Sequence, residues 1–436
     1  MRIAPNEVSI CDVAAFKEIH RIGTPFLKDK WYGSLNTGGP HVNLGLFSFQ
    51  DPKAHAQRRK MLSRGFSQNY LRIQWENMIH EKVNLAIAQI KSESARNGSA
   101  DVLKWFMLMA SDVIANLSFG ESFHMIESGV KADYVQAIED TGILLAIMTE
   151  LKLVYQVGRL LPFMICRKLF YVNDRVFEQG KLAVNNSKAF SESTNIFSTI
   201  NAEAEKGDTS LTDADIQSEA GNFMIAGSDT TSNTLTYLIW AVVSRADVRQ
   251  ALEQEVAIVE EPLTDAKLER LPILNAIIEE TLRLYGAAPA TLPRVVPKGG
   301  ATLAGYFMPE GAIVGTQAFT YHRDPALFPD PEKCDAFSFS DIPSLPTDTN
   351  RRFDYTRWLS SNNISDAAKA AYNPFGAGSR ICIGIHLAKM ELRLAAATFF
   401  RECRGARVAP AATDESMDIE NYFLISPKGH ACEIII

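Results

Sequence analysis

Apolar residues recur along most of this chain at the spacing expected for α-helices. The pattern predicts helices over residues 83–91, 102–119, 131–154 and 273–284, and another after residue 384 whose apolar face carries Ile385, Ala388, Leu392, Ala395 and Phe399. Short alternating stretches between glycines predict β-hairpins over 299–311, and a closing hairpin over 422–436. The chain is therefore predicted to be mainly α-helical with a minor β-region.

Two further helices are predicted from their first residues. Asp51 is suited to cap a helix whose first turn contains Pro52. Thr212 and Asp215 resemble a capping box, with Asp in place of the usual Glu or Gln, and start a helix predicted to run to about Ser244. Upstream of both, residues 2–10 predict a strand and turn before a short helix.

The long helix has an unusual middle. Residues 226–232 place a glycine and several small hydroxyl side chains inside an otherwise apolar stretch. Glycine there costs about 1 kcal/mol of helix stability relative to alanine. Such a defect indicates a place where a group approaches the backbone or a side chain bonds to it.

Composition narrows the class of protein. The chain has 436 residues, 46% of them hydrophobic, which allows a sizeable core. A net charge of −7 and the lack of a basic block interleaved with aromatics argue against nucleic-acid binding. Six dispersed cysteines indicate a reducing compartment. The best apolar stretch, 141–172, is interrupted by charges, so neither a membrane span nor a signal peptide is predicted.

The residues around Cys382 indicate a nucleophile or a metal ligand. The cysteine lies where a loop with Gly376, Gly378 and Gly384 enters the last long helix. Backbone N–H groups and the dipole at a helix start favour a thiolate, and Arg380 adds positive charge. The glycines allow a large planar group to approach the backbone closely. Since no second Cys or His lies at zinc or iron–sulfur spacing, one axial thiolate to haem iron fits better.

The segment from Phe375 to Gly384 matches the pattern F-x-x-G-x-R-x-C-x-G and so resembles the cytochrome P-450 family of haem-thiolate monooxygenases. The resemblance covers nearly the whole chain and implies the triangular, mostly helical fold of that family around haem b, as one domain over residues 1–436. It implies that Phe375, Arg380, Cys382 and Gly384 bind the haem, with Cys382 as the axial ligand of iron. A structural cysteine in a glycine-rich loop is the alternative.

Four basic residues match the family's ligands of the haem carboxylates. His55 and Arg59 are four residues apart on the helix after Asp51 and share a face. The resemblance assigns both to the haem propionates, together with Arg294 and Arg380. For His55 and Arg59 the alternative is a solvated basic helix face.

The defect in the long helix matches the family pattern A-G-x-D/E-T. By position, Asp229 and Thr230 take the roles of the acid and the alcohol that deliver protons during oxygen activation. The alternative is a helix kink rich in serine and threonine.

Glu280 and Arg283 match the family's E-x-x-R pair, and Arg357 lies in a segment of the form F-x-x-x-R-W. The resemblance implies a buried network of these three residues that stabilises the geometry of the cysteine loop. A surface ion pair, which contributes only about 0.2–0.5 kcal/mol, is the alternative for Glu280 and Arg283.

The resemblance also implies a substrate pocket, lined by residues of the long helix, of an extended segment and of the C-terminal hairpin: Ala226, Ala288, Thr291, Leu292 and Phe423. The helix over 51–60 and the Arg357-Trp358 segment resemble fungal microsomal members of secondary metabolism. The expected substrate is a hydrophobic small molecule, terpenoid or polyketide-derived.

The expected partners follow from the same resemblance. O2 is the co-substrate, and an NADPH-cytochrome reductase is the expected electron donor, because the chain contains no flavin or nicotinamide domain. We predict that the reductase docks near Lys389 and Arg393. A monomer is expected. The chain enters the family pattern after the usual membrane anchor, so an anchored full-length form would contact the membrane and lie on the cytosolic face of the endoplasmic reticulum. In the family, the region that includes residues 161–166 forms a lid over the substrate pocket and often contacts the membrane, but an ordinary core helix after a proline break is the favoured alternative for these residues.

Two other functions share the cysteine loop. A haem-thiolate isomerase, dehydratase or peroxygenase often departs from the acid and alcohol pair, so the intact Asp229 and Thr230 count against it. A non-catalytic haem or gas-binding protein would gain nothing from a proton relay. Monooxygenase activity is therefore the predicted function.

Overall fold

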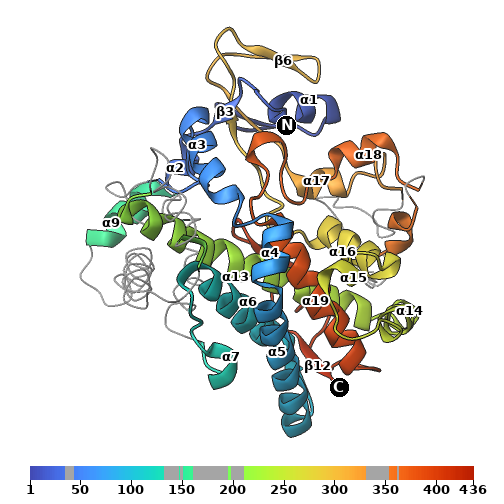
Figure 1. Ribbon diagram of the computed structural model, residues 1–436. Helices are drawn as coiled ribbons and strands as arrows, with labels where there is room; N and C mark the ends of the chain where they lie inside the picture. Colours follow the sequence, from blue (N-terminus) through green and yellow to red (C-terminus); the bar gives the residue numbers. More distant parts are fainter. Residues whose placement is uncertain are drawn as a thin grey trace.

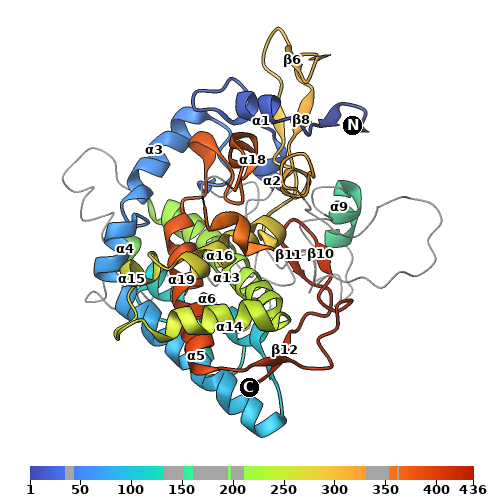
Figure 2. The ribbon, with the colours of Figure 1, turned by 90° about the vertical axis from the view of Figure 1, so that its right-hand side faces the viewer.

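A computed structural model of the chain describes residues 1–34, 44–131, 147, 151–160, 195–197, 211–329, 353–360 and 363–436. Helices form most of this part of the molecule, and its short strands form four small sheets (Figures 1 and 2). The predicted fold class, mainly α with a minor β-region, is confirmed.

The centre of the molecule is the long helix α13 (Asp213–Val243). It packs against α6 (Val102–Phe119), α16 (Pro272–Tyr285) and α19 (Ile385–Glu402), and Figure 1 shows it crossing the middle of the molecule among them. The helix α5 (Glu76–Asn97) packs against α6 and α19. One hydrophobic cluster runs through these helices, with members from Leu46 to Ile434.

Helix α6 is almost entirely apolar and is buried on nearly every face. Among the described residues it is the one helix long and apolar enough to cross a membrane, but 89% of it is buried inside the protein. A core helix shows the same features, so this is weak evidence for a membrane span.

The predicted helix caps are present. The Thr212 side chain accepts a hydrogen bond from Asp215 N–H, and the Asp215 side chain accepts one from Thr212 N–H, which completes a capping box at the start of α13. The Asp51 side chain accepts a hydrogen bond from Ala54 N–H, 2.7 Å away, at the start of α3 (Pro52–Ser63). These local signals fix where both helices begin.

The other described helices surround this centre: α1 (Val13–His20), α2 (Trp31–Ser34), α4 (Gln68–Gln74), α7 (Met125–Ser128), α9 (Lys152–Leu160), α14 (Ala246–Ala257), α15 (Asp265–Leu268), α17 (Ala318–His322), α18 (Asp366–Ala371) and the 3₁₀ helices η2 (Tyr355–Trp358) and η3 (Gly378–Arg380). The helix predicted over 131–154 and the apolar segment 161–166 lie mostly or wholly outside the described residues.

The largest sheet pairs strands from the first 28 residues with strands from residues 294–315. Its strand order is β1-β2-β8-β5-β3, with bounds Arg2–Ala4, Glu7–Ser9, Ile313–Gly315, Arg294–Val295 and Leu27–Lys28. The register places Lys28 opposite Arg294. The hairpin of β6 (Ala301–Leu303) and β7 (Tyr306–Met308) lies at the end of the molecule opposite α5 in both views (Figures 1 and 2).

The predicted closing hairpin over 422–436 is wrong. The hairpin instead pairs β10 (Ile419–Asn421) with β11 (Ile425–Pro427), and β12 (Glu433–Ile435) pairs with β4 (Ala100–Asp101) and β9 (Arg407–Val408). The chain changes direction between β11 and β12, where Gly429 packs tightly on Ser416 and His430 has a φ of +49°. Cys432 N–H then donates to the Asp101 side chain, which directs β12 to a different sheet.

Candidate active site

The cysteine loop connects α18 to α19 and presents Cys382 just before the start of α19. Cys382 N–H donates to the carbonyl of Phe375 at 2.9 Å, and Gly376 and Gly378 have φ angles of +74° and +63°. The first of these contacts closes the loop, and the two positive φ angles are ones that glycine adopts without strain. Glycine at Gly384 completes the turn into the helix.

The Cys382 side chain has solvent-accessible surface although protein atoms surround it. Its side chain has exposed surface, yet burial raises the pKa of its thiol, against the Gly384 N–H and the Arg59 charge, which lower it. From these two properties we infer that Cys382 faces a hollow inside the protein rather than bulk water. Burial therefore outweighs the Gly384 N–H and the Arg59 charge, and a bound cation such as a metal ion would stabilise the deprotonated form.

Gly378 holds the loop against the end of α1. A Cβ at this position would lie 1.9 Å from the His20 carbonyl oxygen, which is backbone and cannot move aside. Glycine is therefore required at Gly378 by this contact as well as by its φ angle.

A cluster of five basic side chains, here called the cationic cluster, lies near this loop: Lys28, His55, Arg59, Arg294 and Arg380. Burial and the Arg294 charge lower the pKa of Arg380 to about 10, and burial with Arg380, Lys28 and Arg59 lowers the pKa of His55 to about 3. Burial, Arg294 and Arg380 also lower the pKa of Lys28. These like charges oppose one another in a desolvated place.

The cationic cluster has few neutralising neighbours. In the part of the chain that the structure describes, no carboxylate forms an ion pair with Lys28, Arg59, Arg294 or Arg380. Buried charges without such partners are costly, so the cluster favours an anion. The two propionates of a haem whose iron is bound by Cys382 have the required charge, so the residues present fit this cofactor.

Each cation of the cluster is oriented by a neutral acceptor. Arg59 Nη1 donates to the Ile381 carbonyl at 2.7 Å, next to Cys382, and Arg294 Nη1 donates to the hydroxyl of Tyr32 at 2.8 Å. The remaining N–H groups of these planar guanidinium ions can bind a carboxylate.

Sequence reasoning missed Lys28 and Tyr32. Lys28 Nζ donates to the Phe47 carbonyl at 2.6 Å and lies 4.1 Å from the centre of the Tyr32 ring. Nothing local in the sequence marks these residues, because Lys28 meets Arg294 only through the pairing of β3 with β5.

The defect in α13 has two structural causes. A Cβ at Gly227 would lie 2.8 Å from a side-chain carbon of Ile114, so the glycine lets α6 pack closely on α13. Thr230 Oγ1 donates to the Ala226 carbonyl at 2.6 Å. Ala226 itself is exposed although most of this helix is buried, and we infer that this face of α13 also borders a hollow. Asp229 and Thr230 are partly exposed beside it.

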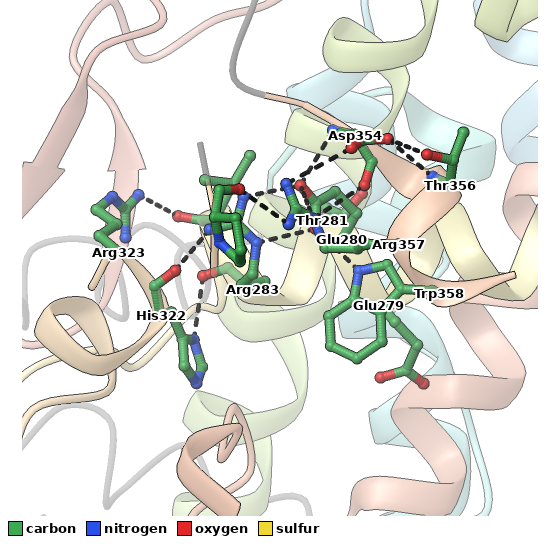
Figure 3. A network of polar contacts seen from close by, with 12 residues as sticks. Glu279, Glu280, Thr281, Arg283, His322, Arg323, Asp354, Thr356, Arg357 and Trp358 are labelled. Carbon is green, nitrogen blue, oxygen red and sulfur yellow. Dashed lines mark hydrogen bonds and ion pairs between the residues drawn. The ribbon is translucent and has the colours of Figure 1, made fainter. Parts of the chain in front are cut away.

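Glu280 is the centre of a buried polar network (Figure 3). Its carboxylate lies 2.7 Å from Arg283 Nη2 and 3.2 Å from Arg357 Nε, and the Trp358 indole N–H donates to it at 2.8 Å. Asp354 N–H is a further donor, at 3.0 Å. The side chains of Glu280 and Arg283 are both 0% exposed, so this pair is not a surface ion pair.

The network reaches the cysteine loop through His322. Arg283 donates to the His322 carbonyl, and the His322 ring bonds the Arg283 carbonyl with Nδ1. Burial lowers the pKa of His322 to about 3, so its ring is neutral, and Nε2 accepts from Asn373 N–H at 3.0 Å. The Asn373 carbonyl accepts from Gly376 N–H at 2.9 Å. A continuous path of hydrogen bonds thus joins Glu280 to the loop, and His322 was not predicted from the sequence.

The residues predicted to line the pocket are all accessible to some degree. Ala288, Thr291 and Leu292 are partly exposed, on the segment that leads into β5. Phe423 lies at the turn between β10 and β11 with a φ of +100°, and its ring contacts Trp31 and Phe47 at centroid distances of 5.6 and 6.0 Å. A bulky residue with positive φ is strained, as is common at ligand-binding positions.

The predicted docking surface at Lys389 and Arg393 is wrong for Arg393. This side chain is 5% exposed, and its Nε and Nη2 both lie 2.6 Å from the buried carboxylate of Asp265. Lys389 Nζ lies 2.6 Å from Glu279 and is partly buried. Arg393 therefore has a structural role, and it cannot receive a partner protein.

Comparison with known proteins agrees with this geometry. A family model described as Cytochrome P450 matches residues 6–343 and 349–433. The chain is 42% identical over 447 residues to the cytochrome P450 monooxygenase stcB of Emericella nidulans, covering 100% of this chain and 81% of the relative. It is 40% identical to the cytochrome P450 monooxygenase aflV of Aspergillus parasiticus, covering 99% and 82%. A methylphloroacetophenone oxidase of Cladonia uncialis is 33% identical, with 76% and 75% covered.

Proposed function

The chain belongs to the cytochrome P450 family, and on this premise we propose that it is a haem-thiolate monooxygenase in which Cys382 is the axial ligand of the haem iron. The family establishes an oxidoreductase that uses haem iron, O2, a redox partner and a small-molecule substrate. The observation that supports Cys382 is its accessible side chain in an enclosed loop, near a cationic cluster whose arginines and lysine form no ion pair with a carboxylate among the described residues.

The haem carboxylates would be bound by His55, Arg59, Arg294 and Arg380. Phe375 and Gly384 would contact the ring from the cysteine loop, where glycines let a planar group come close to the backbone. Lys28 is a further basic side chain at the same place, and burial with Arg294 and Arg380 lowers its pKa. When bound, haem supplies oxygen activation and the transfer of one oxygen atom to substrate, and the thiolate ligand favours O–O cleavage.

Asp229 and Thr230 are proposed to move the protons that oxygen activation needs. The Thr230 hydroxyl donates to the Ala226 carbonyl, and this helical turn borders the hollow. Rotation of the hydroxyl about the Cα–Cβ bond would direct its proton toward a reacting group. The Asp229 carboxyl on the adjacent residue can then restore the proton.

The substrate is proposed to be a hydrophobic fungal secondary metabolite, terpenoid or polyketide-derived. It would contact Ala226, Ala288, Thr291, Leu292 and Phe423, which combine apolar side chains with one hydroxyl. One relative is named for the oxidation of methylphloroacetophenone, an aromatic ketone, and the aromatic rings around Phe423 would suit a ligand of that kind. Aromatic ketones are therefore the first compounds to test.

The remaining assignments are proposed from the family resemblance. The electron donor is an NADPH-cytochrome reductase, and the protein acts as a monomer with one haem domain over residues 1–436. The continuous hydrophobic cluster from Leu46 to Ile434 supports a single domain. An anchored form would lie on the cytosolic face of the endoplasmic reticulum membrane.

Oxygen stoichiometry separates this function from the alternatives. With purified protein, reductase and a compound that shifts the haem absorption, we expect about one NADPH and one O2 to be consumed for each hydroxylated product. An isomerase or dehydratase would form product without using either, and a peroxygenase would need only peroxide. A haem-binding protein without catalysis would form none. Product whose new oxygen does not derive from labelled O2 would contradict the proposal.

A further inference from the structure

The segment over residues 45–50, here called the 45–50 segment, is held by charged side chains from three separate parts of the chain. Leu46 N–H donates to Glu219 of α13, the Phe47 carbonyl accepts from Lys28 of β3, and the Phe49 and Gln50 carbonyls accept from Arg380. Arg380 is two residues before Cys382. The 45–50 segment therefore lies between the central helix and the cysteine loop.

Glu219 makes the contact on the helix side. Its side chain is 0% exposed, and its two oxygens lie 2.9 and 3.1 Å from Leu46 N. Oε1 also lies 2.9 Å from Arg58 Nη1 on α3, while Arg58 Nη2 lies 2.6 Å from Asp215. One buried carboxylate thus binds both the 45–50 segment and the helix that follows it.

The segment lies directly on α13. A Cβ at Gly45 would lie 1.8 Å from Asn222 Nδ2 and 3.4 Å from Glu219 Oε2, so glycine lets the backbone approach this closely with the Asn222 side chain where it lies. The Leu46 side chain is 7% exposed and belongs to the main hydrophobic cluster. Close packing and a charged acceptor together fix the position of the segment.

On the other side, the segment orients Arg380. Arg380 Nη1 and Nη2 donate to the Phe49 and Gln50 carbonyls at 2.7 and 3.1 Å. Both donors of one guanidinium are thereby placed by two consecutive carbonyls, and a shift of the segment would move this charge relative to Cys382.

We propose that Glu219 is a positioning residue that fixes the 45–50 segment on α13 and, through it, the arginine beside Cys382. A carboxylate seven residues ahead of Ala226 then controls the cationic cluster and the cysteine loop without touching either. This role rests on the proposed function where it concerns Cys382, whereas the docking of the segment on α13 does not depend on haem chemistry.

The protonation of Glu219 gives this role a distinctive pH dependence. Burial raises the pKa of Glu219 to about 7, against Leu46 N–H and Arg58, which lower it, while Asp215 raises it further. Below this pH the neutral carboxyl loses its attraction to Arg58 and becomes a weaker acceptor for Leu46 N–H. The contacts with Leu46 N–H and Arg58, which lower the pKa, favour the ionised carboxyl and are expected to weaken as the pH falls through about 7. Burial, which raises the pKa, acts in the opposite sense on the stability of the whole protein, which falls as the pH rises through about 7.

Amide hydrogen exchange of the haem-loaded protein tests the proposal. In Glu219→Gln we expect the protection factor of the Leu46 amide to fall roughly tenfold and to lose the change near pH 7 that the unmodified protein shows. The reduced carbon monoxide complex of this variant should also have less of the red-shifted Soret band, because the cysteine loop is less well held.

Asp112→Asn is the matched control. Asp112 is also 0% exposed, and its carboxylate accepts hydrogen bonds from the backbone N–H groups of Phe123, Met125 and Ile126. None of these contacts involves the 45–50 segment. Exchange should rise at residues 123–126, while the Leu46 protection and its change near pH 7 stay as in the unmodified protein.

A second variant covers the case in which Glu219→Gln does not fold. Gly45→Ala keeps Glu219 but places a methyl group against the Asn222 side chain, so it should expose the Leu46 amide to the extent that this side chain does not move aside, with recovery in Gly45→Ala/Asn222→Ala. Unchanged Leu46 protection in Glu219→Gln would overturn the proposal, as would a Leu46 protection in the unmodified protein that does not change near pH 7. So would faster exchange with an unaltered Soret band, because Glu219 would then not position the cysteine loop. Loss of the proposed haem ligation itself is detected separately, with Cys382 variants.

Discussion

Replacing Glu280 with alanine is expected to give the largest loss of stability of any single substitution considered for this protein. The change leaves Arg283, which is 0% exposed, and Arg357 without their shared carboxylate. Breaking a buried ion pair by removing one partner costs about 3–5 kcal/mol. The variant should unfold at a lower temperature and release haem faster, because the path through His322 to Asn373 also loses its support.

Lys369→Ala is the control for this prediction. Lys369 and Asp366 are also three residues apart on a helix, but their side chains are 46% and 102% exposed and their charges are 3.7 Å apart. This substitution should leave the midpoint of thermal unfolding unchanged. An equal loss of stability in the two variants would show that burial of the Glu280 network contributes little.

Replacing Thr230 with alanine is expected to have the largest effect on turnover. The variant loses the hydroxyl proposed to pass a proton into the hollow, and general acid catalysis of this kind is worth roughly 10²-fold to 10⁴-fold. We expect the rate of product formation to fall by at least about 10²-fold. Haem content and the affinity for a bound compound should change little, since the helix keeps its packing on α6.

Thr236→Ala is the matched control for Thr230→Ala. Thr236 lies on the same helix, and its hydroxyl donates to the carbonyl four residues earlier at 2.8 Å, as that of Thr230 does, but it is fully buried. Turnover in this variant should stay close to that of the unmodified protein. Product formation by Thr230→Ala at the unmodified rate would remove Thr230 from the proposed proton path.

Local sequence patterns predicted the features that depend on neighbouring residues. The caps at Asp51 and Thr212 and the positive φ angles of Gly376 and Gly378 each follow from a few adjacent positions, and the structure shows them. The glycine and small hydroxyl residues in the middle of α13 were also recognised in the sequence. The sequence did not indicate that Gly227 makes room for the Ile114 side chain of α6.

Features that depend on distant pairing could not be predicted in this way. Arg393 has the composition of a surface residue, and its burial is decided by Asp265, which is 128 residues away in sequence. Lys28 joins the cationic cluster only because β3 pairs with β5. The strand Glu433–Ile435 was predicted to belong to the closing hairpin. It pairs instead with strands distant in sequence, where Ile434 lies opposite Ala100 and Val408.

Ligation of haem by Cys382 is the central claim, and the absorption spectrum of the reduced carbon monoxide complex tests it most directly. The unmodified protein should show the red-shifted Soret band that thiolate ligation produces, and Cys382→Ala should abolish it. Cys382→His offers iron a neutral ligand and so distinguishes loss of the thiolate from loss of haem: it should retain haem and give an unshifted band. A red-shifted band that persists in Cys382→Ala would contradict the account.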